Sequence, residues 1–514
     1  MTAVGDAGAA PIDLRLVPAA ATAWAVTAAG ILWHTVGSVV AAVAAAALTA
    51  AAGRFGDARR ADRNTRAGVL AVAAVATAFA IAIGLQVAEL RQHPVAQRYG
   101  TLAAVVVTPT ETPRALGGNR TMFRASLLYL DGRETSGRVL VFASTNDLTE
   151  LTAGTPVRFR ARIGRPTRRD LSVAVLSAVG DPTLGEAAAI HRAAAGVRAD
   201  FADAARRALP VDQAAMLPAL VLGDTSAVPR LTTDEFRASG LTHLTAVSGA
   251  NVTIVCGAVL LSAGLIGPRV AVGIAAVALL AFVVVVQPTA SVLRAAVMGA
   301  ITLLAVLSHR RRQAIPALSA SVLALMIATP ELAVDVGFAL SVSATAALVV
   351  IAPVWSRRLV ARGWPKPLAD AVSVAVAAQL VTAPLVAGMA GTFSVVAVAA
   401  NLAAAPVIPP ITIVGTAAAA LSPLWPAGAG LLIRFTGPEL WWLLGVARWA
   451  AGVPGASLTV PSGPAGVVLI ALSGAALVGA WRWRWVRRAA FGATICLLAW
   501  TVSGLSAGRD TIGG

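Results

Sequence analysis

Apolar runs of about 17–25 residues recur along most of this 514-residue sequence. Each is long enough to cross the roughly 30 Å hydrocarbon core of a bilayer as a helix. Hydrophobic residues make up 57% of the chain and charged residues only 13%, so one water-soluble core could not bury this much apolar surface. The sequence therefore predicts a polytopic α-helical membrane protein, whose helices satisfy their own backbone groups in lipid.

About thirteen spans are predicted. One of them, 395–421, carries Pro406, Pro409 and Pro410, so we expect a broken or re-entrant helix there, lined by protein or a water cavity. The predicted spans lie near 17–35, 37–52, 68–88, 241–265, 270–286, 288–308, 314–330, 335–353, 367–390, 395–421, 428–450, 464–481 and 489–506.

The net charge of +17 is concentrated in four short loops. These loops, 53–67, 309–313, 355–367 and 481–488, hold sixteen Arg or Lys residues against two Asp residues. Short loops rich in Arg and Lys face the cytoplasm. We therefore expect a cytoplasmic N-terminus and an extracytoplasmic insert over residues 89–212. That insert has seventeen Arg against twelve acidic residues, a modest excess that favours an anionic partner.

Five short strands are predicted in the insert, at about 100–107, 121–130, 136–142, 155–163 and 170–178. The sequence DGRETSG at 131–137 suits a hairpin turn between two of them. Five strands in about eighty residues are typical of a small barrel such as an OB-fold, a scaffold often used for nucleic acids.

A basic stripe is predicted on the fourth strand. Val157, Phe159, Ala161 and Ile163 alternate with three arginines, and this period of two places the apolar side inward and the guanidinium groups outward. The stripe is a candidate DNA-binding surface or simply a solvated strand face; single strands stack on exposed aromatic side chains, and the insert has no Trp and two tyrosines, Tyr99 and Tyr129. The three arginines are Arg158, Arg160 and Arg162.

Several polar or ionisable side chains interrupt the apolar spans, and such groups are costly in hydrocarbon. With the predicted orientation they gather in the outer half of the membrane, as the lining of a vestibule or pore mouth would. Ser248 and Gly249 lie beside them and either allow close backbone approach or pack helices together. The polar set comprises His243, Asn251, Arg294, Asp335, Ser341 and Asn401.

Two interpretations remain open for Arg294. It pairs with Asp335 and locks two helices together, or it contacts a polyanion that passes through the membrane. His243 is either a core histidine or a proton carrier. A hydrolase acting through His243 and Ser248 would need a nucleophile elbow and a triad, neither of which is apparent.

No cofactor or metal site is predicted. Cys256 and Cys496 lie in apolar spans, where a thiol behaves as a small hydrophobe. The chain's one lysine, Lys366, is not in a glycine-rich phosphate loop, so a Walker-A site is excluded. Nucleotide-derived energy would have to come from a partner.

Four blocks of the sequence resemble the ComEC family of competence proteins. The first is LVLGDTSAVPRLTTDEFRASGLTHLTAVSGANVTIV at 220–255, followed in the expected order by SVLRAAVM at 291–298, DVGFALSVSATAAL at 335–348 and NLAAAPVIPP at 401–410. These blocks include Gly337 and Phe338 beside the polar set. With the OB-like insert placed before them, the resemblance covers about residues 60–480.

The resemblance implies an inner-membrane channel that passes a single DNA strand during transformation. Its partners would be single-stranded DNA, membrane lipids, a DNA receptor, a separate nuclease and a cytoplasmic ATPase. Many family members carry a metallo-β-lactamase-like domain after the membrane core, and this sequence matches the form without it, since its five histidines are scattered. We therefore expect a channel and not an enzyme. A permease for a smaller solute is the alternative, because the membrane physics fits it equally well.

The expected organisation has five parts. They are N-terminal membrane helices at 1–92, an OB-like domain at 93–182, an amphipathic linker helix at 183–212, the channel core at 213–481, and a C-terminal helix and tail at 482–514.

Overall fold

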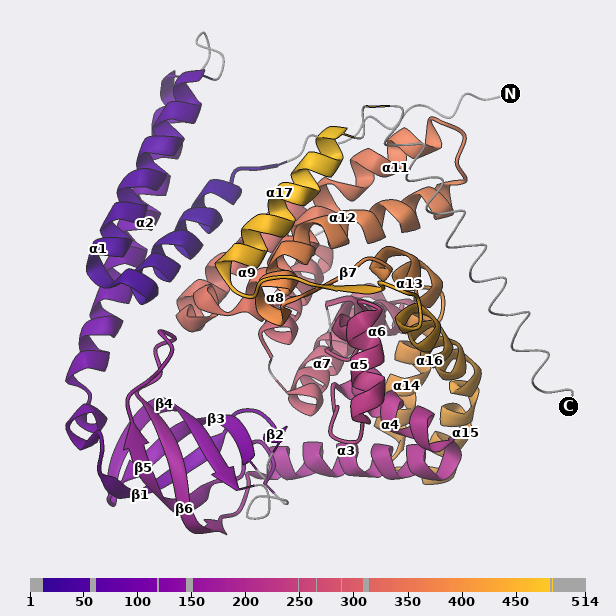
Figure 1. Cartoon of the computed structure of the whole chain (residues 1–514), viewed down its shortest axis with the longest axis horizontal. Helices are drawn as coiled ribbons and strands as arrows, with labels where there is room; N and C mark the ends of the chain where they lie inside the picture. The colour runs from indigo at the N-terminus through magenta and orange to yellow at the C-terminus, as the bar shows by residue number, and fades with distance from the viewer. Residues whose placement is uncertain are drawn as a thin grey trace, which may run out of the picture.

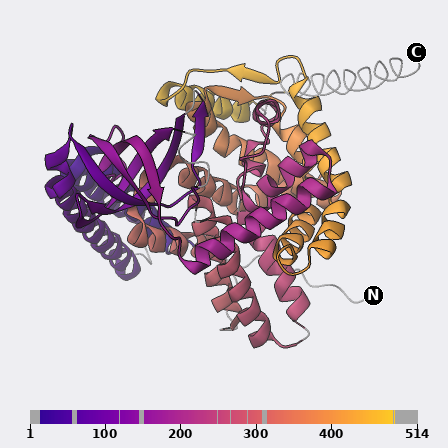
Figure 2. The same cartoon turned by 90° about the horizontal axis from the view of Figure 1, so that it is seen from below.

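The structure is a computed structural model that describes residues 13–55, 62–117, 120–144, 151–247, 249–264, 266–287, 289–307, 314–480 and 483. A β-barrel lies to one side of a larger helical body, and helix α3 leads from the barrel across that body (Figures 1 and 2). Ser248, most of the loop 481–488 and the predicted span 489–506 lie outside the described residues.

The barrel is closed by five strands. β1 pairs with β3 and β5, β3 with β4, β4 with β6 in parallel, and β6 with β5, while β2 extends the sheet beside β3. This ring order is that of an OB-fold, as predicted; β2 was not predicted. The elements are η1 (Pro94–Arg98), β1 (Leu102–Pro109), β2 (Arg114–Gly117), β3 (Arg120–Leu130), β4 (Arg133–Ser144), β5 (Val157–Gly164) and β6 (Ala174–Leu184).

The barrel has its own hydrophobic core, built by alternation along each strand. On β5, Val157, Phe159, Ala161 and Ile163 are buried, whereas the intervening residues are exposed. The β3–β4 hairpin turns at Asp131 and Gly132, both with positive φ (48° and 79°). An Asp-Gly pair favours this conformation because glycine and aspartate tolerate the left-handed region. The hairpin prediction is confirmed.

The N-terminal helices are α1 (Val17–Phe55) and α2 (Asp62–Gln92). A sharp kink interrupts α1 at Trp33 and His34, where His34 has φ 61° and ψ −154°. The two predicted segments 17–35 and 37–52 are therefore separate helical halves on either side of this kink (Figure 1). Trp24 ties the first half to the helical body, because its Nε1 donates to the carbonyl of Ala333 at 2.9 Å.

The helical body follows the barrel. Its main core unites α3, α4, α6–α8 and α13–α16 around the buried helix α4. The elements are α3 (Ala189–Ala208), α4 (Val211–Leu222), α5 (Arg230–Ala238), η3 (Thr242–Leu244), α6 (Gly249–Ala263), α7 (Pro268–Val286), α8 (Ala290–Leu307), α9 (Ala314–Ala328), η4 (Pro330–Val334), α10 (Val336–Val350), α11 (Ala352–Val360), α12 (Lys366–Ala390), α13 (Ala397–Ala404), α14 (Ile408–Leu421), α15 (Pro426–Phe435), α16 (Gly437–Ala451) and α17 (Pro464–Ala480).

Thirteen spans are not confirmed. Within the described residues, four helices are long and apolar enough to cross a membrane, and a fifth span results if the bent pair α13–α14 counts as one. Other predicted spans correspond to helices of 10–17 residues, such as α6 and α8. The predicted span 428–450 divides into α15 and α16 because Gly437 and Pro438 follow Thr436 and proline removes a helical hydrogen bond. The four long helices are Ala67–Arg98, Arg269–Val286, Val336–Val360 and Lys366–Ala390.

The break in the predicted span 395–421 is confirmed. α13 and α14 meet at an angle of 54° on either side of Ala405, Pro406 and Val407. A short two-stranded sheet joins the segment before α13 to the segment after α16. It is formed by β7 (Thr392–Ser394) and β8 (Ser457–Thr459). This pair was not predicted, because three-residue strands carry too little sequence pattern.

Candidate functional site

Arg294 is the buried cation of the helical body. It lies on the first turns of α8 and its side chain is only 4% exposed. Its Nε donates to the hydroxyl of Ser341 on α10 at 2.9 Å, and one terminal nitrogen lies 3.0 Å from the sulfur of Met298. The Ser341 hydroxyl is also 3.1 Å from that of Ser291. In the described part of the chain no carboxylate pairs with Arg294, so its charge is held by neutral groups.

Gly249 lies against this guanidinium. A Cβ at Gly249 would be 2.9 Å from a terminal nitrogen of Arg294, so a side chain here would displace the cation. Gly249 is also the first residue of α6, where backbone N–H groups lack intrahelical acceptors and the helix dipole is positive. The glycine is partly accessible. The start of α6 and Arg294 together form a positively charged place that suits an anion.

Asn251 has a structural task. Its side-chain amide is buried and donates to the carbonyl of Leu220 at 3.1 Å. Leu220 lies in the last turn of α4, which ends at the left-handed Gly223. The last carbonyls of a helix have no intrahelical donor, so Asn251 satisfies one of them. It thereby joins α6 to the buried α4.

Of the two interpretations left open for Arg294, the ion pair with Asp335 is not found among the described residues. Asp335 is the N-cap of α10 and accepts from the backbone N–H of Phe338 at 2.8 Å. Its other oxygen lies 4.0 Å from Arg124 of β3. The N-cap role leaves this carboxylate at the helix end, where the barrel reaches it. Gly337 supports this turn, because a Cβ there would lie 3.0 Å from Oδ1 of Asp335.

Further contacts hold the barrel on the helical body. Arg138 of β4 pairs with Glu331 of η4 at 2.5 Å. At the α7–α8 junction, the Gln287 side chain accepts from the Thr112 backbone at 3.1 Å and donates to its hydroxyl at 2.7 Å. Arg124 and Arg138 project from neighbouring strands β3 and β4. The outer face of this strand pair is therefore the docking face of the barrel.

The docking contacts of Arg124, Arg138 and Glu331 were not predicted, and Asp335 was assigned to the vestibule instead. Glu331 and Asp335 stand four residues apart at the start of a predicted span, which is a visible signal of two carboxylates at one membrane edge. The docking role of Arg124 and Arg138 was harder to predict from the sequence, because exposed arginines on strands are common in solvated sheets.

His243 and Asn401 belong to a second neighbourhood. η3 places His243 before α6 and not inside a span. Nearby, Gly240 packs on Ala397, where a Cβ on the glycine would meet the alanine at 2.5 Å. Asn401, one turn further along α13, donates to the carbonyl of Ala397 at 2.8 Å. His243 is exposed, and desolvation by the surrounding protein lowers its pKa, while a hydrogen bond from the ring to the backbone of Gly240 opposes this shift.

The arginine stripe on β5 has the predicted orientation. Arg158, Arg160 and Arg162 are exposed and alternate with buried residues. Among the described residues they form no ion pair or hydrogen bond. In the five-strand ring, β5 lies between β1 and β6, opposite the β3–β4 docking face. The stripe therefore faces away from the helical body.

The comparisons with known proteins give one match. A family model described as "Competence protein" matches residues 220–485, which is just over half of the chain. The matched region contains every predicted site residue of the helical body, and it begins in α4, the helix that Asn251 caps. No curated protein and no solved structure matches the chain. A membrane-type helical body with the four sequence blocks and this family match leads to one conclusion: the chain belongs to the competence protein family.

Proposed function

We propose that this protein forms the inner-membrane path for one strand of DNA during DNA uptake. Membership in the competence protein family implies a role in DNA uptake, and the apolar helices fit a membrane protein. In this proposal the N-terminus is cytoplasmic and the barrel extracytoplasmic. The end of α1, the start of α2 and the basic helix α11 lie at one end of the molecule, and the barrel lies at the other (Figure 1). This arrangement supports that orientation.

One observation carries the proposal: Arg294 is buried beside the start of α6 without a carboxylate partner among the described residues. Removing a guanidinium from water without an ion-pair partner costs several kcal/mol. A structural cation would recover this cost from a carboxylate. A cation that meets passing phosphates recovers it from the substrate, and the positive N-terminal end of α6, whose first residue Gly249 is partly accessible, adds to the attraction.

The proposed route begins at the barrel. The stripe on β5 attracts incoming DNA without sequence preference, because guanidinium groups bind phosphates and release counterions. Arg294 and the start of α6 then contact phosphates within the membrane. His243 and Asn401 supply further polar groups beside this path.

The test is transformation of the native host with Arg294 variants. Arg294→Ala is expected to keep its membrane level and to lower transformation frequency on the order of 100-fold, since truncating a buried charge contact costs about 2–5 kcal/mol. Arg269→Ala, which removes an exposed arginine at the start of α7, is the matched control. Normal transformation by a well-expressed Arg294→Ala protein would refute the proposal.

Two further variants separate charge from structure. Arg294→Lys should retain part of the activity because it keeps the charge. The exchange Arg294→Asp with Asp335→Arg should not restore activity, because Asp335 contacts Arg124 instead. In proteoliposomes, passage of labelled single strands supports the channel, whereas passage of small solutes alone supports the permease.

Topology can be checked independently. Reporter fusions near residues 60, 310 and 360 should report the cytoplasm, and one near residue 150 should report the outside. A cytoplasmic report near 150 would reverse the proposed route.

A further inference from the structure

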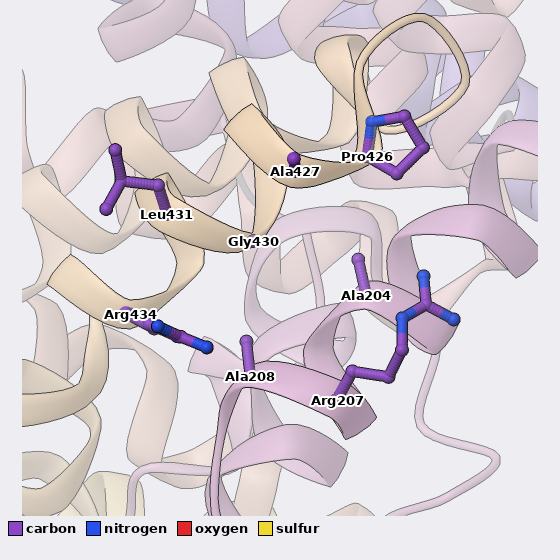
Figure 3. A pocket seen from close by; sticks show the side chains of 8 residues that line it. All are labelled: Ala204, Arg207, Ala208, Pro426, Ala427, Gly430, Leu431 and Arg434. Carbon is purple, nitrogen blue, oxygen red and sulfur yellow. The ribbon is translucent and has the colours of Figure 1, made fainter.

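A pocket lies between α3 and α15, away from Arg294 and from the barrel. Its volume is about 330 Å³. Small residues on both helices leave the space open, among them Ala204 and Ala208 on α3 and Gly430 on α15. Figure 3 shows Arg207 and Arg434 on opposite helices beside it. The pocket thus combines an apolar wall with two cations.

The two cations are not neutralised by the protein. Arg207 and Arg434 are exposed, and within the described residues neither forms an ion pair or a hydrogen bond. The neighbouring carboxylate of Asp203 is already paired with Arg206. Both arginines line the pocket, and a guanidinium suits a phosphate because it offers a planar fork of donors.

The surface around the pocket is strongly apolar. Trp425 is 59% exposed, Leu431 56% and Phe435 66%, all on or next to α15. Trp441 on α16 is 63% exposed. Tryptophans with exposed aliphatic neighbours are typical of the membrane–water interface. A free phosphate gains nothing from this wall, whereas the acyl chains of a lipid are buried by it; a single DNA strand, whose bases stack on aromatic rings, is the competing occupant that the test below distinguishes.

Helix α3 has the geometry of an interfacial element. It runs across the ends of the body helices in Figure 1 and packs on α4, α7, α14 and α15. Phe201, Ala204 and Ala205 are buried on one side, whereas Arg206 and Arg207 are exposed. An amphipathic helix of this kind lies at the level of lipid headgroups. The pocket therefore opens where a phospholipid phosphate would be.

We propose that the pocket between α3 and α15 binds an anionic phospholipid, with its phosphate between Arg207 and Arg434 and its acyl chains along Leu431 and Phe435. Basic pockets between transmembrane helices, described for the cytoplasmic side of membranes, bind anionic headgroups through the same kind of charge contact. The bound lipid would fasten α3, the link between barrel and body, to the helical body. This site does not depend on the DNA path.

The test uses the full chain, purified in neutral detergent and titrated with phosphatidylglycerol or with phosphatidylcholine. Native mass spectrometry counts bound lipid, and thermal unfolding gives the half-saturating concentration. Phosphatidylglycerol should bind and stabilise, and Arg207→Ala with Arg434→Ala should raise its half-saturating concentration about tenfold or more. The control, Arg206→Ala with Arg230→Ala, removes two exposed arginines outside the pocket and should bind as the wild type.

A second pair of variants leaves the charge in place. Gly430→Phe fills the pocket, and a Cβ at Gly430 meets nothing within 4 Å, so the backbone accepts it. Gly445→Phe on α16, which is equally open, is its control. Loss of the bound lipid in Gly430→Phe alone supports the site.

Three results would overturn the proposal. One is unchanged lipid binding in both the double arginine variant and Gly430→Phe. Another is protection by inorganic phosphate equal to that by phosphatidylglycerol, which would make the apolar wall irrelevant. The third is displacement of the lipid by a single-stranded oligonucleotide that binds through Arg207 and Arg434, which would assign the pocket to DNA.

Discussion

Within the part of the chain that the structure describes, the barrel and the helical body both present arginines without acidic partners, but under opposite conditions. On β5, Arg158, Arg160 and Arg162 project into solvent from alternate positions of one strand. In the helical body, Arg294 is 4% exposed and is held by Ser341 and Met298. The side chains are chemically identical, and only their surroundings differ.

This difference in burial decides how strongly each arginine indicates a function. An exposed guanidinium costs almost nothing, so the stripe is compatible with DNA binding and equally with a solvated face. A buried guanidinium without a carboxylate partner destabilises the folded protein by several kcal/mol. A protein that keeps such a group is therefore expected to use it in its function. The predictions below test this contrast in order of decreasing effect.

The largest effect is expected from Gly249→Val. The new side chain would push the guanidinium of Arg294 from its place, because even a Cβ lies 2.9 Å from it. Transformation frequency should fall on the order of 100-fold, like that of a variant lacking the charge contact. Gly257→Val is the control on the same helix, since a Cβ there meets nothing within 4 Å. Equal activity of the two valine variants would separate Gly249 from the site.

Removal of the stripe should have a moderate effect on DNA binding. The segment 89–188 contains the whole closed barrel and its own core. Replacing Arg158, Arg160 and Arg162 by alanine should weaken binding to a single-stranded oligonucleotide. It should also reduce the slope of log K against log salt by about 2, since each lost phosphate contact contributes about 0.7.

A control is needed because the isolated segment also frees the docking face. Arg124→Ala with Arg138→Ala removes the arginines that contact Asp335 and Glu331 in the whole chain. If this double variant loses binding and the triple variant does not, the docking face binds the DNA and the stripe is a solvated surface.

Asn251→Ala should mainly affect stability. It leaves the buried carbonyl of Leu220 without this donor, and an unsatisfied buried group costs about 1–3 kcal/mol. Thermal unfolding in detergent should shift down, and transformation should fall only as far as the membrane level falls. A strong loss of transformation at an unchanged membrane level would instead give Asn251 a direct role in the path.

The smallest effect is expected from Asp335→Asn. Asparagine keeps the N-cap bond to Phe338 and loses only the charge that faces Arg124, a partly exposed pair worth about 0–1 kcal/mol. Protease cleavage of the barrel–body junction should rise slightly. Asp335→Ala also removes the cap and should destabilise the protein by about 1 kcal/mol more. A transformation defect in Asp335→Asn as severe as that of Arg294→Ala would restore a functional link between the two residues.

Much of the local structure could be predicted from sequence patterns. The strict alternation in 157–163 predicted which side of β5 is exposed, and the Asp-Gly pair predicted the β3–β4 turn. The prolines at 406, 409 and 410 predicted the bend between α13 and α14. These features depend on neighbours within one strand or helix, so the sequence contains the necessary information.

Predictions that required distances between segments were less successful. Opposite charges at Arg294 and Asp335 suggested an ion pair, but the start of α10 turns Asp335 toward the barrel, where Arg124 was not considered. The count of about thirteen spans is not confirmed, because among the described residues only four or five segments are long and apolar enough to cross and several other apolar helices have 10–17 residues. For Asn251, which was assigned to a vestibule, the hydrogen bond to Leu220 of α4 was not predicted.

The sequence by itself determined the membrane class, the barrel and its strand faces, the bent helix and the family, because hydrophobic periodicity, turn residues and ordered sequence blocks are local properties. The tertiary structure decided which charges are compensated. A charged side chain has a low free energy in water and a high one in a packed core unless it has partners. Those partners come from residues distant in the chain, namely Gly249 and Ser341 for Arg294, and Arg124 for Asp335.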